Sequence, residues 1–157
     1  MASLRPEVVH HMEEGGVRLA DAAAPETRSL VPWLKLGATR DEDYLMGNKC
    51  QKCGVLYLGP RQYCGACSSE GPFNEVKLGR SGAIHVWSII HQAPAYANPP
   101  YATAIVDLDD GVCVNTNLAV EAKPENIDFG MRVKMVTEKV SEDREGNAYV
   151  AYKFMPA

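Results

Sequence analysis

Apolar and polar residues alternate with a period of two from about residue 73 onward, in short runs that turn residues separate. This pattern is typical of an all-β domain. The runs predict five strands, at 83–91, 102–108, 112–120, 131–139 and 148–154. In the first of them, strict alternation would place Ile84, Val86, Ser88 and Ile90 on one face and His85, Trp87, Ile89 and His91 on the other.

Two connections between these strands narrow the topology. Asp109-Asp110-Gly111 predicts a tight hairpin turn between the second and third strands. Pro124 favours one helical turn between the third and fourth. Five short strands with a helical element after the third follow the order of an OB-type barrel. We therefore expect a mainly β protein whose residues 73–157 form a five-stranded OB-fold barrel.

Residues 1–46 show no long periodic pattern and predict an N-terminal arm. Pro6 and the pair Gly15-Gly16 would begin and end one short helix. After it, prolines and Gly37 break the pattern and favour an extended segment anchored by Trp33. Such an arm would pack either on a partner or on the second domain of its own chain.

Four of the five cysteines fall in residues 47–72, a segment too poor in apolar residues to fold unaided. They form two Cys-x2-Cys pairs, and two such pairs can complete a tetrahedral site of four sulfurs for zinc. The residues between the pairs read as a small hairpin, so this segment is expected to be a zinc ribbon. The predicted ligands are Cys50, Cys53, Cys64 and Cys67.

The same four cysteines leave two other interpretations open. One is a single-iron centre, which accepts the same ligand set. The other is a pair of disulfides, which a reducing compartment disfavours. In either metal form, four protein ligands leave no open coordination position, so the ion is expected to be structural.

Composition narrows the class of protein further. At 157 residues the chain has room for one domain, or for a small domain with a stapled module, which excludes a large multidomain enzyme. Its formal charge of -4 predicts no general attraction to nucleic acid or to an anionic membrane. No stretch approaches the ~20 apolar residues of a membrane span, and the first residues lack the pattern of a signal peptide. We therefore expect a cytoplasmic protein.

Two further chemistries have candidate residues. Cys113 is a possible nucleophile for a stand-alone CoA thioesterase, but no helix N-terminus or adjacent base is visible, so we interpret it as a packing residue. A single-stranded nucleic-acid-binding module is the second alternative, because OB barrels and zinc ribbons both serve that purpose. The predicted strand faces carry few basic and aromatic residues for it.

The order of several motifs is informative beyond each motif alone. From about Tyr44 to the C-terminus come Cys-x2-Cys-Gly, Pro60-Arg61, the second Cys-x2-Cys, Gly79-Arg80-Ser81-Gly82, Asn98-Pro99-Pro100-Tyr101, the Asp-Asp-Gly hairpin and Ile127-Asp128-Phe129-Gly130-Met131-Arg132-Val133. In this order they resemble the DUF35 family of OB-fold proteins with a rubredoxin-like zinc ribbon. Gly59 and Gly65 stand where that family often has proline, and both changes would loosen the ribbon.

The resemblance implies an accessory subunit that is not an enzyme by itself. Members of that family are typically non-catalytic partners of thiolase-type enzymes, and some associate with hydratases acting on CoA thioesters. It also implies that the four paired cysteines bind zinc. The extension that carries Trp33 is similar to that of a thiolase small subunit in aromatic-compound degradation.

We therefore expect a chain that binds a thiolase-like catalytic subunit and helps to shape or cover its CoA-thioester site. Arg61 and Lys52 are the candidate contacts to CoA. Tyr96 and Tyr101, in a proline-rich loop, and Trp33, in the arm, are the candidate contacts to partner or substrate.

Overall fold

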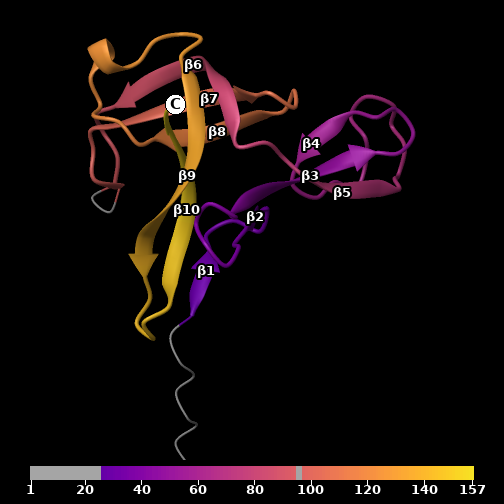
Figure 1. Ribbon diagram of the computed structural model, residues 1–157, viewed down its shortest axis with the longest axis horizontal. Helices are drawn as coiled ribbons and strands as arrows, with labels where there is room; N and C mark the ends of the chain where they lie inside the picture. Colours follow the sequence, from indigo (N-terminus) through magenta and orange to yellow (C-terminus); the bar gives the residue numbers. More distant parts are fainter. Residues whose placement is uncertain (1–25, 95–96) are drawn as a thin grey trace, which may run out of the picture.

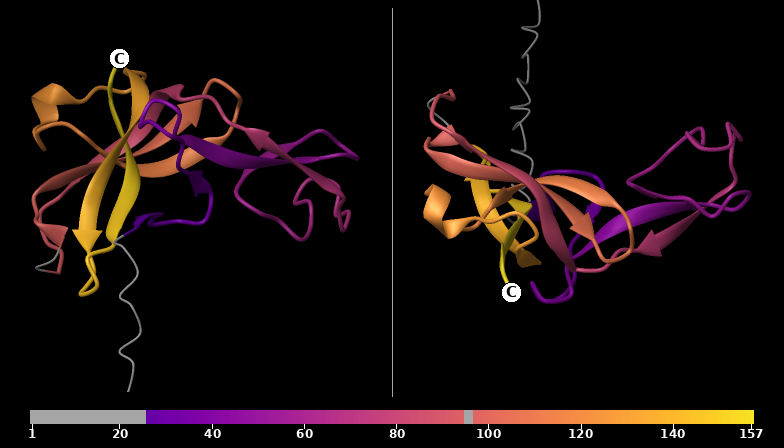
Figure 2. Two further views of the ribbon diagram at one scale, coloured as in Figure 1. Left: turned by 60° about the horizontal axis from the view of Figure 1, so that its bottom comes forward. Right: turned by 90° about the horizontal axis from the view of Figure 1, so that it is seen from above.

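The computed structural model describes residues 26–94 and 97–157. The short helix predicted between Pro6 and Gly16 and the candidate contact Tyr96 lie outside the described residues. Within the described parts the chain is mainly β, as the alternation predicted. Its strands form two sheets, one wrapped into a barrel and one in a ribbon that projects to the side (Figures 1 and 2).

The barrel consists of the five strands that the sequence predicted. They are β6 (Ser81–Ile90), β7 (Tyr101–Leu108), β8 (Cys113–Leu118), β9 (Arg132–Glu142) and β10 (Ala148–Pro156). With β1 (Thr27–Ser29) at one edge, the sheet order is β1-β10-β8-β7-β6-β9, and β9 also pairs with β10, which closes the barrel. A 3-10 helix, η2 (Pro124–Asn126), follows β8. This order confirms the OB-fold expectation.

Alternation along the strands builds the barrel core. In β8, Val114, Thr116 and Leu118 are buried while the residues between them are exposed. Val106 of β7 and Phe154 of β10 have no exposed surface at all. One hydrophobic cluster results, and burial of such side chains is the main stabilising contribution in a domain of this size.

The first barrel strand departs from strict alternation. The register of β6 against β7 shifts between Ile84 and Val86, which is a β-bulge. Ile84 is buried, whereas Val86 is 40% exposed, so the expectation that these two residues share a face is wrong. The bulge turns His85 and Val86 both toward solvent, because one extra residue reverses the facing of all that follow.

The ribbon sheet is built around β3 (Tyr44–Cys50). β2 (Leu34–Lys35), β4 (Leu56–Leu58) and β5 (Phe73–Lys77) all pair with it in antiparallel register. β3 begins before residue 47, and β5, which pairs with it along its whole length, lies after residue 72. The ribbon sheet therefore includes residues on both sides, in the sequence, of the predicted segment 47–72. The division of the chain into residues 1–46, 47–72 and 73–157 stays a prediction.

Buried contacts join the ribbon sheet to the barrel. Leu34, Leu45 and Leu78 belong to the same hydrophobic cluster as the barrel core. The Arg80 guanidinium donates to the carbonyl oxygen of Met135 on β9 and to that of Asp41 before β3. These contacts fix the base of the ribbon where the chain enters and leaves it.

The described part of the arm, residues 26–46, packs on its own chain, which was one of the two expected arrangements. Trp33 is half-buried against the hydrophobic cluster, and a Cβ placed on Gly59 would lie 3.3 Å from its ring. Gly59 has a φ of 70°, which proline cannot adopt. Glycine at this position, where the family often has proline, therefore has a direct conformational and packing reason.

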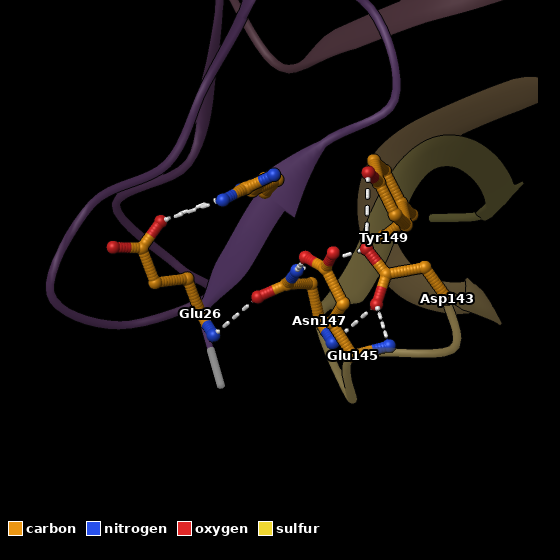
Figure 3. Close-up of polar contacts among 6 residues, drawn as sticks. Glu26, Asp143, Glu145, Asn147 and Tyr149 are labelled. Carbon is orange, nitrogen blue, oxygen red and sulfur yellow. Dashed lines mark hydrogen bonds and ion pairs between the residues drawn. The ribbon is translucent and has the colours of Figure 1, made fainter. Parts of the chain in front are cut away.

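A polar cluster ties the start of the described chain to the β9–β10 hairpin (Figure 3). The Asp143 carboxylate accepts the backbone amides of Glu145 and Asn147, each over 2.9 Å. Asn147 in turn accepts the backbone amide of Glu26 over 2.9 Å. As a result β1 (Thr27–Ser29) is aligned parallel to β10.

Candidate functional site

Four cysteine thiols converge at the end of β3 that points away from the barrel (Figure 1). Cys50 ends β3 and Cys53 follows in the next turn, while Cys64 and Cys67 come from the loop after β4. All four sulfurs lie within 4.8 Å of one another. The Sγ atoms of Cys50 and Cys67 are 3.8 Å apart, and those of Cys53 and Cys64 are 3.4 Å apart.

These distances fit one tetrahedral metal ion. With metal–sulfur bonds of about 2.3 Å, neighbouring sulfurs in a tetrahedral site lie about 3.8 Å apart. The four-cysteine group is therefore suited to zinc. In residues 26–94 and 97–157 no second group of three His, Cys, Asp or Glu ligand atoms lies this close together.

Hydrogen-bond donors from the backbone and from nearby hydroxyl groups favour the thiolate form of two of these cysteines. Backbone amides of Cys53 and Lys52, together with the Ser69 hydroxyl, lower the pKa of Cys50. The Tyr57 hydroxyl, followed by the amides of Cys67 and Ala66, lowers the pKa of Cys64 to about 6. Since the thiolate is the metal ligand, these donors prepare the site for an ion.

Tyr57 of β4 is the residue beside the site that sequence reasoning missed. Its hydroxyl accepts the backbone amide of Ala66 over 3.2 Å and lies 3.4 Å from Cys64 Sγ. Because the amide is already a donor to this oxygen, the single phenolic proton is free to point at the sulfur. The Arg61 guanidinium covers the ring 5.0 Å from its centroid, which holds the side chain in place.

Replacing Tyr57 by phenylalanine is expected to weaken metal binding by about 10–100-fold, the range typical of lost outer-shell donors. Competition with a chromogenic chelator measures the affinity, and the thiolate-to-cobalt absorption band of the Co2+ form reports on the sulfur directly. Tyr63→Phe is the matched control, because that exposed hydroxyl bonds to Glu70 and, among the described residues, to no cysteine. Equal affinities for the two variants would contradict this role of Tyr57.

The other candidate residues from the sequence do not come together at one site. Lys52 and Arg61 are exposed on the ribbon near the cysteines, and Arg61 stacks on Tyr57. Tyr101 is half-buried and lines a groove of about 550 Å³ on the barrel, together with residues of β8, β9 and β10. Trp33 lies in the arm against Gly59. Contacts of these residues with CoA, substrate or partner stay predictions.

Cys113 forms a hydrogen-bonded chain that the sequence did not reveal. Its thiol donates to Asp107 Oδ1 over 2.9 Å, and His85 Nδ1 lies 2.8 Å from the other carboxylate oxygen. The neighbouring carboxylate raises the pKa of Cys113. Since the carboxylate lies between thiol and imidazole, His85 cannot take the thiol proton directly, which disfavours Cys113 as a nucleophile. The sequence offered one signal for the contact between Asp107 and Cys113, because the register of the predicted hairpin pairs these two residues.

No helix within the described residues is long and apolar enough to cross a membrane. A closed five-stranded barrel with a four-cysteine ribbon defines an OB-fold protein that carries a zinc-ribbon module.

Comparison with known proteins agrees with that class and narrows it. The family model described as the C-terminal OB-fold domain of ChsH2 matches residues 75–138. A DUF35 domain-containing scaffold protein of Methanocaldococcus jannaschii is 35% identical over 115 residues, which cover 71% of this chain and 81% of the relative. The chain belongs to the DUF35 family.

Two further similar proteins carry more specific descriptions. The benzoylsuccinyl-CoA thiolase subunit BbsA of Geobacter metallireducens is 30% identical over 111 residues, which cover 71% of this chain and 73% of BbsA. Among solved structures, a chain of the Ltp2-ChsH2(DUF35) aldolase aligns with a TM-score of 0.58 at 28% identity. That alignment covers 72% of this chain and 84% of the other.

Proposed function

We propose that this chain is a non-catalytic zinc-ribbon and OB-fold subunit that associates with a thiolase-like enzyme and supports the conversion of CoA thioesters. The observation that carries the proposal is its similarity to proteins described as a scaffold and as a thiolase subunit, and to a chain of the Ltp2-ChsH2(DUF35) aldolase. Each likeness covers more than two thirds of the chain.

The chemistry of the described residues supports a non-catalytic role. Zinc held by four thiolates would have no open position for water or substrate. It would therefore stabilise the ribbon rather than polarise a carbonyl group. Cys113, whose pKa is raised by Asp107, is a poor nucleophile at neutral pH. The catalytic groups of the assembly would accordingly come from the partner.

The ribbon provides basic side chains for a contact with CoA. Lys52 and Arg61 are exposed next to the cysteines, and their charges suit the phosphates of the CoA nucleotide. Four thiolates and one Zn2+ carry a formal charge of about -2, which these residues also offset. From the likeness to BbsA, the finer form of the proposal is that the CoA thioester carries an acyl group from aromatic-compound degradation.

Co-expression with the neighbouring genes tests the association. We expect the tagged chain to retain an acyltransferase subunit through affinity and size-exclusion chromatography, in a fixed stoichiometry. Metal analysis and an absorption spectrum of the complex should show one zinc per chain and no iron–thiolate bands. Recovery of the chain without any acyltransferase subunit would refute the proposed function.

A further inference from the structure

The outward face of β6, β7 and β8 carries almost no charge. Two adjacent rows of side chains run across these three strands, and each row has one residue from each strand. The strand register places the residues of a row side by side. We call them the uncharged face; its residues are Val86, Ile105 and Asn115 in one row and Ser88, Thr103 and Asn117 in the other. All six are exposed or half-exposed, although 23% of the whole chain is charged.

Two aliphatic side chains lie at the centre of this face. Val86 and Ile105 pair directly across the strands and are 40% and 39% exposed. They line a shallow depression of about 230 Å³ with Thr103 and Asn115. The bulge in β6 creates the pair, because it turns Val86 out of the barrel. A solvent-facing sheet normally carries polar or charged residues at such positions.

Polar groups border the aliphatic pair on both sides along β7. Asp107 follows Ile105 by two residues on β7 and is bonded to His85 and Cys113, so its charge is locally engaged. Thr103 donates to the carbonyl oxygen of Thr116 over 3.0 Å. An apolar, charge-depleted centre with a polar border is the anatomy of a protein–protein interface.

Charge and size indicate which partner fits. Nucleic acid requires basic and aromatic side chains together; the uncharged face has no basic residue, and Trp87 is the one aromatic residue that lines its depression. A second copy would bring together two chains of formal charge -4 through a face with no basic residue. The face is also small, because three strands span only about 10 Å. Its area therefore falls well short of what a stable interface buries, which is about 800 Å² per partner. It is therefore suited to be one contact within a larger interface with a different protein.

We propose that the uncharged face docks on an uncharged, partly aliphatic surface of the catalytic subunit, with Val86 and Ile105 as its buried centre. This inference rests on the proposed function. The amide side chains of Asn115 and Asn117 would hydrogen-bond to backbone groups of that subunit as water leaves the face.

A charge placed on the face tests the docking. Ile105→Lys should weaken binding to the co-expressed acyltransferase subunit by at least about 10-fold, because a desolvated, unpaired ammonium is costly. Asn115→Asp, which is nearly isosteric, should weaken it in the same direction. Phe129→Lys is the matched control, since Phe129 is 71% exposed in the turn before β9 and lines neither the depression nor the groove at Tyr101. It should bind within about 3-fold of wild type.

The outcomes separate the two proposals. Retention of the subunit by the wild type, with equal affinity for Ile105→Lys and Phe129→Lys, overturns the docking face alone. Failure of the wild type to retain the subunit overturns both proposals. If the isolated chain is a dimer that Ile105→Lys converts to a monomer, the face serves a second copy, and the docking proposal is wrong. Circular dichroism and urea unfolding of each variant check that its fold is intact.

Discussion

Cys64→Ser should release the metal and unfold the ribbon while the barrel stays folded. Cys64 is 2% exposed, and beyond the base of the ribbon the buried side chains are mainly those of Cys50 and Cys64 themselves. A module with so small a core takes its folding free energy from metal–thiolate bonds. Loss of one of four ligands should therefore lower metal affinity by more than the ~100-fold that an outer-shell change can cost.

Metal content and limited proteolysis measure this effect. Trypsin should cut the variant rapidly at Lys49, Lys52 and Arg61, whereas the barrel fragment should persist because its hydrophobic cluster is intact. Cys113→Ser is the matched control, since Cys113 is exposed on β8, where its thiol bonds to Asp107 and lies outside the four-cysteine group. A Cys64→Ser protein with full zinc content and wild-type resistance to trypsin would show that the four-sulfur site is wrongly assigned.

Phe154→Ala should destabilise the barrel by about 3–5 kcal/mol. Phe154 lies on β10 with no exposed surface, and β10 pairs with both β8 and β9 where the barrel closes. Removal of its ring leaves a cavity that the paired strands cannot collapse to fill. Urea unfolding of the metal-loaded protein, followed by tryptophan fluorescence, measures the change in the free energy of unfolding.

Phe129→Ala provides the comparison for that measurement. Phe129 is 71% exposed and touches Trp87 with ring centroids 6.2 Å apart. Its loss should cost less than about 1 kcal/mol. Equal destabilisation by the two substitutions would mean that the barrel core is not packed around Phe154.

The sequence predicted most of the fold because its signals are local. Alternation placed five barrel strands, and the Asp109-Asp110-Gly111 turn set the pairing of two of them. The spacing of the cysteine pairs alone identified four residues that the fold brings within 4.8 Å of one another. Such spacing is sufficient because two residues between cysteines form a turn whose geometry hardly depends on the rest of the chain.

Other features escaped sequence reasoning because they depend on contacts between distant segments. Tyr57 reads as an ordinary strand residue, and only the fold of the cysteine loop brings its hydroxyl to Cys64. The pairing of β5 with β3, and of β1 with β10, joins segments that have no common pattern. The bulge at His85 gives no signal in the alternation and yet reverses the facing of Val86.

By itself, the sequence determined the class of the protein: a mainly β chain, a barrel with five strands, a four-thiol ribbon and a DUF35 pattern of motifs. These follow from periodicity, turn chemistry and ligand spacing, which act over a few residues. Only the tertiary structure decided that Trp33 packs on Gly59, that Asp107 separates Cys113 from His85, and that Val86 and Ile105 form an exposed pair. Each of these depends on strand register, because a shift of one residue in register moves a side chain to the opposite face of the sheet.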